Sequence, residues 1–441
     1  MSFKIKSLLL GSLLGISAFQ VSADDLLQIY QLAQEKDPVI LQSKAQRDIA
    51  FEQISESKAS LLPQIGFSAG ATYTDTDNQA IDSISNSSAS VSLSQSLYSQ
   101  SNWTNLSIAE KNASQADVSY QSEQQNLIIR VSKAYFAVLR AMDNLNFVAA
   151  TKTAVGRQLE QTKQRFKVGL TAITDVHEAQ AEYDRTLAEE IQANNDLSNS
   201  YEALRELTGV QARQLKILNT ERFEPRELSH NVDYWLSTAG EHNLTLNAQR
   251  IAQQIAKQQI KLAQTGHQPS LNLTAGIGYE KNQYGNDSYN TLNGGDTNSG
   301  NIGLEFSWPL YSGGSINSQV KQAQLSYIES SEALEQSYRS VQSSIHSLVN
   351  NVTSSIGSVT AYQQTVVSSK SALDATEAGF EVGSRTIVDV QDATRNLYSA
   401  MNQLANARYD YILNMLELKQ TAGNLSQDDL ALINAGLMKS L

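Results

Sequence analysis

Two pairs of segments alternate apolar residues with small polar ones. In the first half of the chain, residues 65–73 place apolar side chains at every second position between Gly, Ser and Thr, and residues 91–97 alternate with Ser. In the second half, residues 271–279 and 302–310 repeat this pattern. A period of two over about ten residues, apolar on one face, is typical of transmembrane β-strands. On alternation alone, two hairpins of a half-buried sheet remain an equal alternative.

The stretches that follow the hairpins predict very long helices. Residues 64–224 and 310–441 contain no proline and are rich in Ala, Gln, Glu, Leu and Ser. Proline breaks helices, whereas most of these residues favour them. From residue 101 to 165, and again from 315 to 379, no strong breaker interrupts the chain. Because a helix of about 65 residues is about 100 Å long, these segments indicate a coiled-coil barrel or stalk.

The chain is an internal duplication. Phe166-x-Val168-Gly169 and the residues after it recur from Phe380 onward, and other matched segments keep the same order along the chain. We therefore predict a signal peptide at 1–23, an equatorial connector at 215–240 and an equatorial C-terminal segment at 424–441. The first repeat, 24–214, contains a helix, a β-hairpin at 64–98, a long helix at 101–166 and a helix at 172–209. The second repeat, 241–423, contains a helix, a β-hairpin at 270–311, a long helix at 315–380 and a helix at 385–422.

The first residues are typical of a secretory signal. Lys4 and Lys6 precede a short apolar run, and small residues placed for cleavage end at Ala23. No later apolar stretch approaches the 18 or so residues of a transmembrane helix. A periplasmic protein and an outer-membrane β protein both fit these features.

Composition excludes several function classes. The chain has 33 Lys and Arg against 45 Asp and Glu, a net charge of −12, which argues against a nucleic-acid partner. The lack of cysteine excludes a disulfide scaffold, a thiolate zinc site and a cysteine nucleophile. The five histidines are scattered, and no Walker or nucleophile-elbow motif is present. We predict no enzyme activity, no catalytic residues, no metal and no cofactor.

The number of predicted strands has a quaternary consequence. Even the smallest membrane barrels need about eight strands, so four cannot close a barrel. Unpaired sheet edges are not tolerated in lipid, because each bare backbone group costs several kcal/mol there. The strands must therefore be pooled among subunits, and a dimer, trimer or tetramer would each satisfy this requirement.

Several long motifs resemble the outer membrane efflux protein (outer membrane factor) family across nearly the whole predicted mature chain; they lie at residues 60–64, 164–176, 317–324, 382–390 and 404–409. The resemblance implies an α+β fold in which a homotrimer forms a 12-stranded transmembrane β-barrel, four strands per protomer, continued by a long periplasmic α-helical coiled-coil barrel. It implies an outer membrane exit duct, extending into the periplasm, for tripartite multidrug efflux pumps and type I protein or toxin secretion. The implied partners are periplasmic adaptor (membrane fusion) proteins, inner-membrane resistance-nodulation-division or ABC transporters, and outer membrane lipid.

Two acidic residues follow the second glycine turn. Asp389 and Asp392 are three residues apart, hence on one helix face, and Asp175 and Glu178 repeat the arrangement. By spacing alone, a solvated face or acids favoured near a helix N-terminus explain them. If the second pair faces the axis of a trimer, six carboxylates form a ring that attracts cations. The resemblance implies this role, an electronegative entrance ring at Asp389 and Asp392.

The resemblance also implies a gate and a docking site. It places Gln158, Thr174, Asp175 and Arg385 in a latch that holds the inner coiled coils shut; the alternative is a surface ion pair of little energy. The family has Tyr where this chain has Phe380, which cannot donate a hydrogen bond to Asp175. We therefore expect a looser closure that depends more on Arg385. The helix tips imply adaptor contacts at Val168, Gly169, Leu170, Val382, Gly383 and Ser384, although glycine there also serves as a cap.

One function from another class remains as an alternative. A periplasmic coiled-coil adaptor or scaffold without pore activity would share the long helices, but it would fractionate with the periplasm. An uptake porin would lack those helices. The alternating segments favour the channel.

Overall fold

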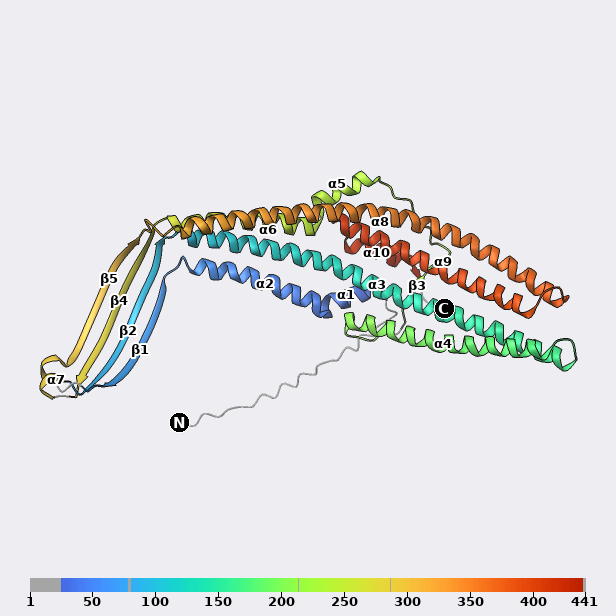
Figure 1. The fold of residues 1–441 in the computed structure, drawn as a ribbon, viewed down its shortest axis with the longest axis horizontal. Coiled ribbons are helices and arrows are strands. Elements are labelled where there is room, and N and C mark those ends of the chain that lie inside the picture. The colour runs from blue at the N-terminus through green and yellow to red at the C-terminus, as the bar shows by residue number, and fades with distance from the viewer. Residues whose placement is uncertain (1–24, 78–80, 213, 286, 439–441) are drawn as a thin grey trace, which may run out of the picture.

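The computed structural model describes residues 25–77, 81–212, 214–285 and 287–438, and the predicted signal peptide lies outside them. A curved sheet stands at one end of the molecule, and long helices run from it to the opposite end (Figure 1). The fold is therefore α+β, with its strands and helices separated along one axis, as the sequence predicts.

The sheet has the order β1-β2-β4-β5 and is antiparallel throughout. Its strands are β1 (Gln64–Asp75), β2 (Ser83–Tyr98), β4 (Ser270–Tyr284) and β5 (Gly295–Ser307). The register places Phe67 opposite Val91, and Val91 opposite Ile277, so apolar residues share one face. Ser68, Ser90 and Gly278 are aligned in the same way on the other face.

The apolar face of the sheet is exposed within one chain. Phe67 is 73% exposed and Ile302 is 79% exposed, and every residue of β1 and β5 is exposed. A half-buried sheet would cover this face, so the structure of a single chain does not match that alternative. The strand β5 also ends at Ser307, before the predicted limit of 311, because Pro309 has no N–H for the ladder.

Four helices make the two long hairpins of the molecule. The helices α3 (Gln100–Lys167) and α8 (Ser315–Glu381) have 68 and 67 residues, or about 100 Å each. They turn back into α4 (Ile173–Thr208) and α9 (Ile387–Ala422). These bounds lie within two residues of the predicted ones, and α9 begins at Ile387 instead of 385 because Thr386 caps it.

Shorter helices complete the layer nearer the sheet. The helices α2 (Pro38–Ala59) and α6 (Leu244–Gln264) pack against α3, and α6 also packs against α8. The end of α9 meets the start of α6, where Asn243 caps α6 and its Nδ2 donates to the Thr421 carbonyl at 2.7 Å. A short 3₁₀ helix (Thr265–His267) leads from α6 to the sheet, and a short helix, α7 (Asp287–Asn293), lies in the β4–β5 loop.

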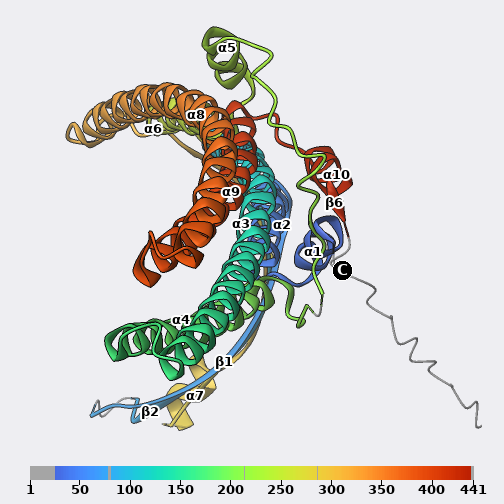
Figure 2. The same ribbon diagram turned by 90° about the vertical axis from the view of Figure 1, so that its right-hand side faces the viewer.

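A belt of small elements lies on the convex side of the long helices (Figure 2). It contains α1 (Leu26–Lys36), α5 (Val232–His242), α10 (Gln427–Ala435) and a two-stranded ladder of β3 (Ile217–Leu218) with β6 (Leu437–Met438). Trp235 of α5 packs with Ile345 of α8 and Leu418 of α9. The largest core cluster, centred on Tyr135 and Phe136 of α3, joins α1, α4, α9 and α10. The predicted equatorial segments 215–240 and 424–441 contain β3, most of α5, α10 and β6, whereas α1 lies in the segment predicted as the first repeat.

Candidate functional site

The end of the molecule opposite the sheet carries two similar helix tips. Gly169 and Gly383 have φ of +76° and +78°, in the left-handed region that favours glycine. At each tip the glycine N–H bonds back to a phenylalanine carbonyl, of Phe166 at 2.9 Å or Phe380 at 3.1 Å. The N–H that follows reaches one residue further back, which makes both turns Schellman motifs.

Both tips expose apolar side chains. Val168, Leu170 and Val382 are 70%, 69% and 81% exposed. Because they are exposed in one chain, these side chains are available for contact with another protein.

The predicted acidic pair lies at the start of α9, but its two carboxylates are held differently. Asp389 accepts hydrogen bonds from Thr386 N and Oγ1, both at 2.8 Å, in a capping box. The Thr386 N–H and hydroxyl, with a smaller contribution from the Arg385 charge, lower the pKa of Asp389 below its usual value. Asp392 forms an ion pair with Arg395, and Arg395 Nε lies 3.8 Å from Glu182 of α4. Arg395 therefore compensates part of the acidic charge.

The predicted latch residues are not all joined within one chain. Asp175 accepts hydrogen bonds from the hydroxyls of Thr171 and Thr174, and no ion pair with Arg385 is present among the described residues. Arg385 instead lies over Gly379, where an added β-carbon would be 2.7 Å from its Cγ. A latch between Asp175 and Arg385 stays a prediction for contacts between chains.

The structure does bring Gln158 and Phe380 together. Both line a cavity of about 250 Å³ between α3, α8 and α9. Gln158 is buried, and its Oε1 has no hydrogen-bond partner among the described residues. The guanidinium carbon of Arg165 lies 4.8 Å from the centre of the Phe380 ring.

Arg165 and Arg395 are the residues that the sequence prediction missed at this end. Arg395 is three residues after Asp392, a spacing that places the two on one helix face and was available in the sequence. The contact of Arg165 with Phe380 joins residues far apart in the chain. Only the packing of the two hairpins reveals it.

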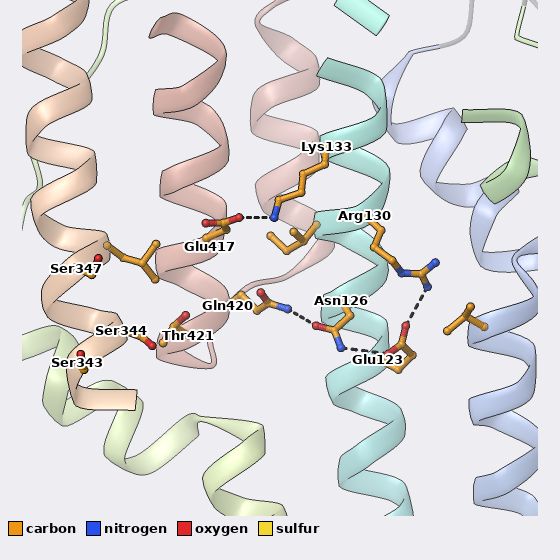
Figure 3. A pocket seen from close by; sticks show the side chains of 13 residues that line it. Glu123, Asn126, Arg130, Lys133, Ser343, Ser344, Ser347, Glu417, Gln420 and Thr421 are labelled. Carbon is orange, nitrogen blue, oxygen red and sulfur yellow. Dashed lines mark hydrogen bonds and ion pairs between the residues drawn. The ribbon is translucent and has the colours of Figure 1, made fainter. Parts of the chain in front are cut away.

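A second polar region ties α3 to the end of α9 at mid-length (Figure 3). Lys133 Nζ pairs with Glu417 Oε1 at 2.6 Å, and Gln420 Nε2 donates to Asn126 Oδ1 at 2.6 Å. These side chains form one wall of a cavity of about 850 Å³, and α8 contributes the opposite wall with Ser343, Ser344 and Ser347. The charged groups named here already have partners, so the region acts as a structural clamp.

A partly buried polar pair, of Asp143 and the buried Tyr409, lies between α3 and α9 closer to the tips. The Tyr409 hydroxyl donates to Asp143 Oδ2 at 2.6 Å. Burial raises the pKa of Asp143, although Tyr409 and the Arg408 charge oppose the shift. Burial and the neighbouring carboxylate also raise the pKa of Tyr409.

Neither a membrane-spanning helix nor a metal site is found. Of the helices that the structure describes, none is both long and apolar enough to cross a membrane. In the same parts of the chain, no three His, Asp or Glu side chains are grouped so as to hold a metal ion.

Comparison with known proteins identifies the family. The profile of the family described as outer membrane efflux protein matches residues 29–210 and 235–424. The chain belongs to the outer membrane efflux protein family. It is accordingly an outer membrane transport protein with a periplasmic extension, and it is not an enzyme.

Individual family members resemble the chain over most of its length. The outer membrane protein TolC of Vibrio cholerae is 50% identical, with 98% of each chain covered. The alkaline protease secretion protein AprF of Pseudomonas aeruginosa is 28% identical over 99% of this chain and 92% of its own. The crystal structure of the CmeC outer membrane channel of Campylobacter jejuni superposes with a TM-score of 0.76 at 16% identity, covering 94% of this chain and 90% of CmeC.

Proposed function

We propose that three copies of this chain pool their strands into one 12-stranded β-barrel in the outer membrane. The long helices continue that barrel through the periplasm as an α-helical duct. The assembly serves as the exit channel of tripartite multidrug efflux pumps and of type I secretion systems. The description of the matched family, outer membrane efflux protein, supports a role in efflux, and a relative named for alkaline protease secretion, AprF, supports a role in protein secretion.

This proposal rests on the two open edges of the sheet. Its edge strands β1 and β5 have no further partner strand among the described residues, and its apolar face is bare. Lipid would cover that face, but it cannot satisfy the backbone groups of two open edges. Joining β5 of one copy to β1 of the next satisfies both edges at once. The Ser- and Gly-rich face then lines water.

The helical end supplies the partner contacts and the gate. Periplasmic adaptor proteins would dock on the exposed tips, at Val168, Gly169, Leu170, Val382, Gly383 and Ser384, and would link the duct to resistance-nodulation-division or ABC transporters. Asp389 and Asp392 of three copies would form a cation-attracting entrance ring. Gln158, Thr174, Asp175, Phe380 and Arg385 would control its closure. Residues 1–23 would direct export.

Thiol labelling tests the orientation of the sheet. The chain has no cysteine, so an introduced cysteine is the only thiol. Ile302 and Asn301 are neighbours on β5 that face opposite sides of the sheet, and both are exposed in one chain. In outer membranes, Ile302→Cys should react with a lipid-soluble maleimide, and Asn301→Cys should react only with a water-soluble one. Equal reaction of both variants with the water-soluble reagent would refute a membrane barrel.

Planar-bilayer recording tests the pore itself. Purified protein should insert as a trimer and conduct ions. Multivalent cations added at the helical side should block it, and Asp389→Asn/Asp392→Asn should remove the block. Asparagine keeps an oxygen that can accept the Thr386 hydrogen bonds, so this variant separates charge from folding. Protein that stays monomeric and conducts nothing would favour the periplasmic scaffold instead.

A further inference from the structure

The two helix tips are joined inside one chain by a contact that involves no ion pair. Arg165 lies in the last turn of α3, and Phe380 lies in the last turn of α8. The Arg165 guanidinium carbon is 4.8 Å from the ring centre, within the distance of a cation–π contact. Among the described residues, no carboxylate lies within ion-pair distance of Arg165. The ring is thus the group that Arg165 engages.

Both residues are fixed by the turns that they help to build. The Arg165 carbonyl accepts the N–H of Leu170 at 2.9 Å, and the Phe380 carbonyl accepts the N–H of Gly383 at 3.1 Å. A shift of either hairpin therefore moves one partner of the contact. The Phe380 ring also lines the cavity that contains Gln158, so the contact lies next to that cavity.

Comparison of the two repeats shows that this contact is specific to one ring. Phe166 is the counterpart of Phe380 in the first repeat; it is 41% exposed, and no arginine or lysine of the described residues lies over its ring. The counterpart of Arg165 in the second repeat is Gly379, which cannot supply a cation. Of these two rings, Phe380 alone has an arginine of the other hairpin over it in the part of the chain that the structure describes.

We propose that Arg165 is a positioning residue of the gate, which holds the α8–α9 hairpin against the α3–α4 hairpin through the ring of Phe380. This inference rests on the proposed channel function, because it assigns the contact to the closure of the duct. A ring suffices for it, so the lack of a tyrosine hydroxyl at position 380 does not leave the hairpins unconnected. Loss of the ring or of the cation favours separation of the hairpins.

The expected size of the effect follows from the exposure of the contact. Both side chains are half-buried. A cation–π contact at a partly exposed site changes an equilibrium by about two- to five-fold. In a trimer with three equal contacts that must all open, the change multiplies to roughly ten- to one-hundred-fold.

A buried thiol can report the separation of the hairpins. Val390 of α9 lines the same cavity and is only 2% exposed. In purified full-length Val390→Cys protein, the reaction rate with a maleimide should measure how often the hairpins part. Arg165→Gln and Phe380→Leu should each raise that rate about two- to five-fold. The double variant should react no faster than the faster single variant, because either change removes the same contact.

Conservative variants and a matched control separate this contact from general loosening of the tip. Phe380→Tyr in the Val390→Cys protein keeps the ring, so the thiol should react no faster than in Val390→Cys alone, which gives the background rate. Lys163→Gln removes a cation two residues from Arg165 that pairs with Glu160 instead, and it should leave the rate unchanged. An unchanged rate in Arg165→Gln, or rates that multiply in the double variant, would overturn the inference.

The labelling also separates this inference from the proposed function. Thiol reactivity reports the hairpins whether or not the protein conducts ions. If the expected rates appear in a protein that forms no pore, the channel is refuted and the contact stands. If the protein conducts and Arg165→Gln labels at the background rate, the contact is refuted and the channel stands.

Discussion

Replacing Arg395 by glutamine should make the proposed entrance ring bind divalent cations more tightly. Each chain brings Asp389, Asp392 and Arg395 to the start of α9, and Arg395 is paired with Asp392. Their formal charges leave one negative charge per chain. Removing Arg395 leaves two, so the ring of a trimer would double its negative charge. The carboxylates themselves, and the capping box of Asp389, stay as they are.

The magnitude depends strongly on salt. At about 10 Å in water, one arginine repels a divalent ion by about 0.8 kcal/mol, so three arginines contribute about 2.5 kcal/mol. With a Debye length of about 8 Å at 0.15 M salt, about 0.7 kcal/mol remains, which is roughly a three-fold change in affinity. At 0.01 M salt the Debye length is about 30 Å, and the change becomes roughly twenty-fold.

Single-channel recording with Mg²⁺ added at the helical side measures this effect as the half-blocking concentration. Arg395→Gln should lower that concentration by these factors, and Asp392→Asn should raise it. Arg339→Gln serves as the control, because Arg339 is an exposed arginine of α8 that pairs with Glu335 far from the tip. A half-blocking concentration in Arg395→Gln that equals or exceeds the wild-type value at both salt concentrations would refute the reasoning.

Three further predictions concern the tips and the partly buried Asp143. Because Thr386 lowers the pKa of Asp389, its carboxylate stays charged as the pH falls, so Mg²⁺ block should persist to about pH 4; loss of block by pH 5 would contradict this. Gly383→Ala should cost about 1–2 kcal/mol through its positive φ, whereas Gly357→Ala, inside α8 with free space around it, should be neutral or stabilising in thermal denaturation. Asp143 has a raised pKa, so its contribution to the free energy of unfolding falls as pH rises from about 4 through that pKa. The melting temperature of Asp143→Asn relative to wild type should therefore increase from pH 4 to pH 7. A constant difference between the two melting temperatures would argue against this prediction.

The elements of the fold were predictable because each follows from a local pattern. Apolar residues at every second position predicted the apolar face of each strand, and the absence of proline predicted the length of α3 and α8. The ends of elements depended on single residues, such as Pro309 after β5 and Thr386 before α9. The helix α7 lies inside the predicted β-hairpin 270–311 and has no such signal, since a polar segment of seven residues is typical of a loop.

The candidate site was predictable only where its members are close in sequence. The capping box of Asp389 and the glycine turns are local, and the structure places them as their spacing indicates. Contacts between hairpins, such as Arg165 with Phe380 and Arg395 with Glu182, depend on the axial position of each long helix relative to its neighbour. A shift of one turn, about 5.4 Å, would break either contact, and sequence spacing does not define that shift.

The duplication explains why the two tips have the same turn, although their side chains make different contacts. Arg385 of the second tip corresponds to Thr171 of the first, and the counterpart of Arg165 is Gly379. Each tip therefore has one arginine, on opposite sides of its glycine turn. Gly379 leaves room for Arg385 to lie along its own helix, while Arg165 reaches across to the other hairpin.

The same asymmetry extends to the acids that follow the turns. Thr386 caps α9 and fixes Asp389, whereas Ala172 at the matching position gives α4 no side-chain cap. Asp175 is left to accept the hydroxyls of its own turn. Arg395, which partners Asp392, has Ala181 as its counterpart. Substitutions after an ancestral duplication have thus concentrated the fixed acids and their compensating cation on the second hairpin, so the proposed ring and the proposed movement both belong to α8 and α9.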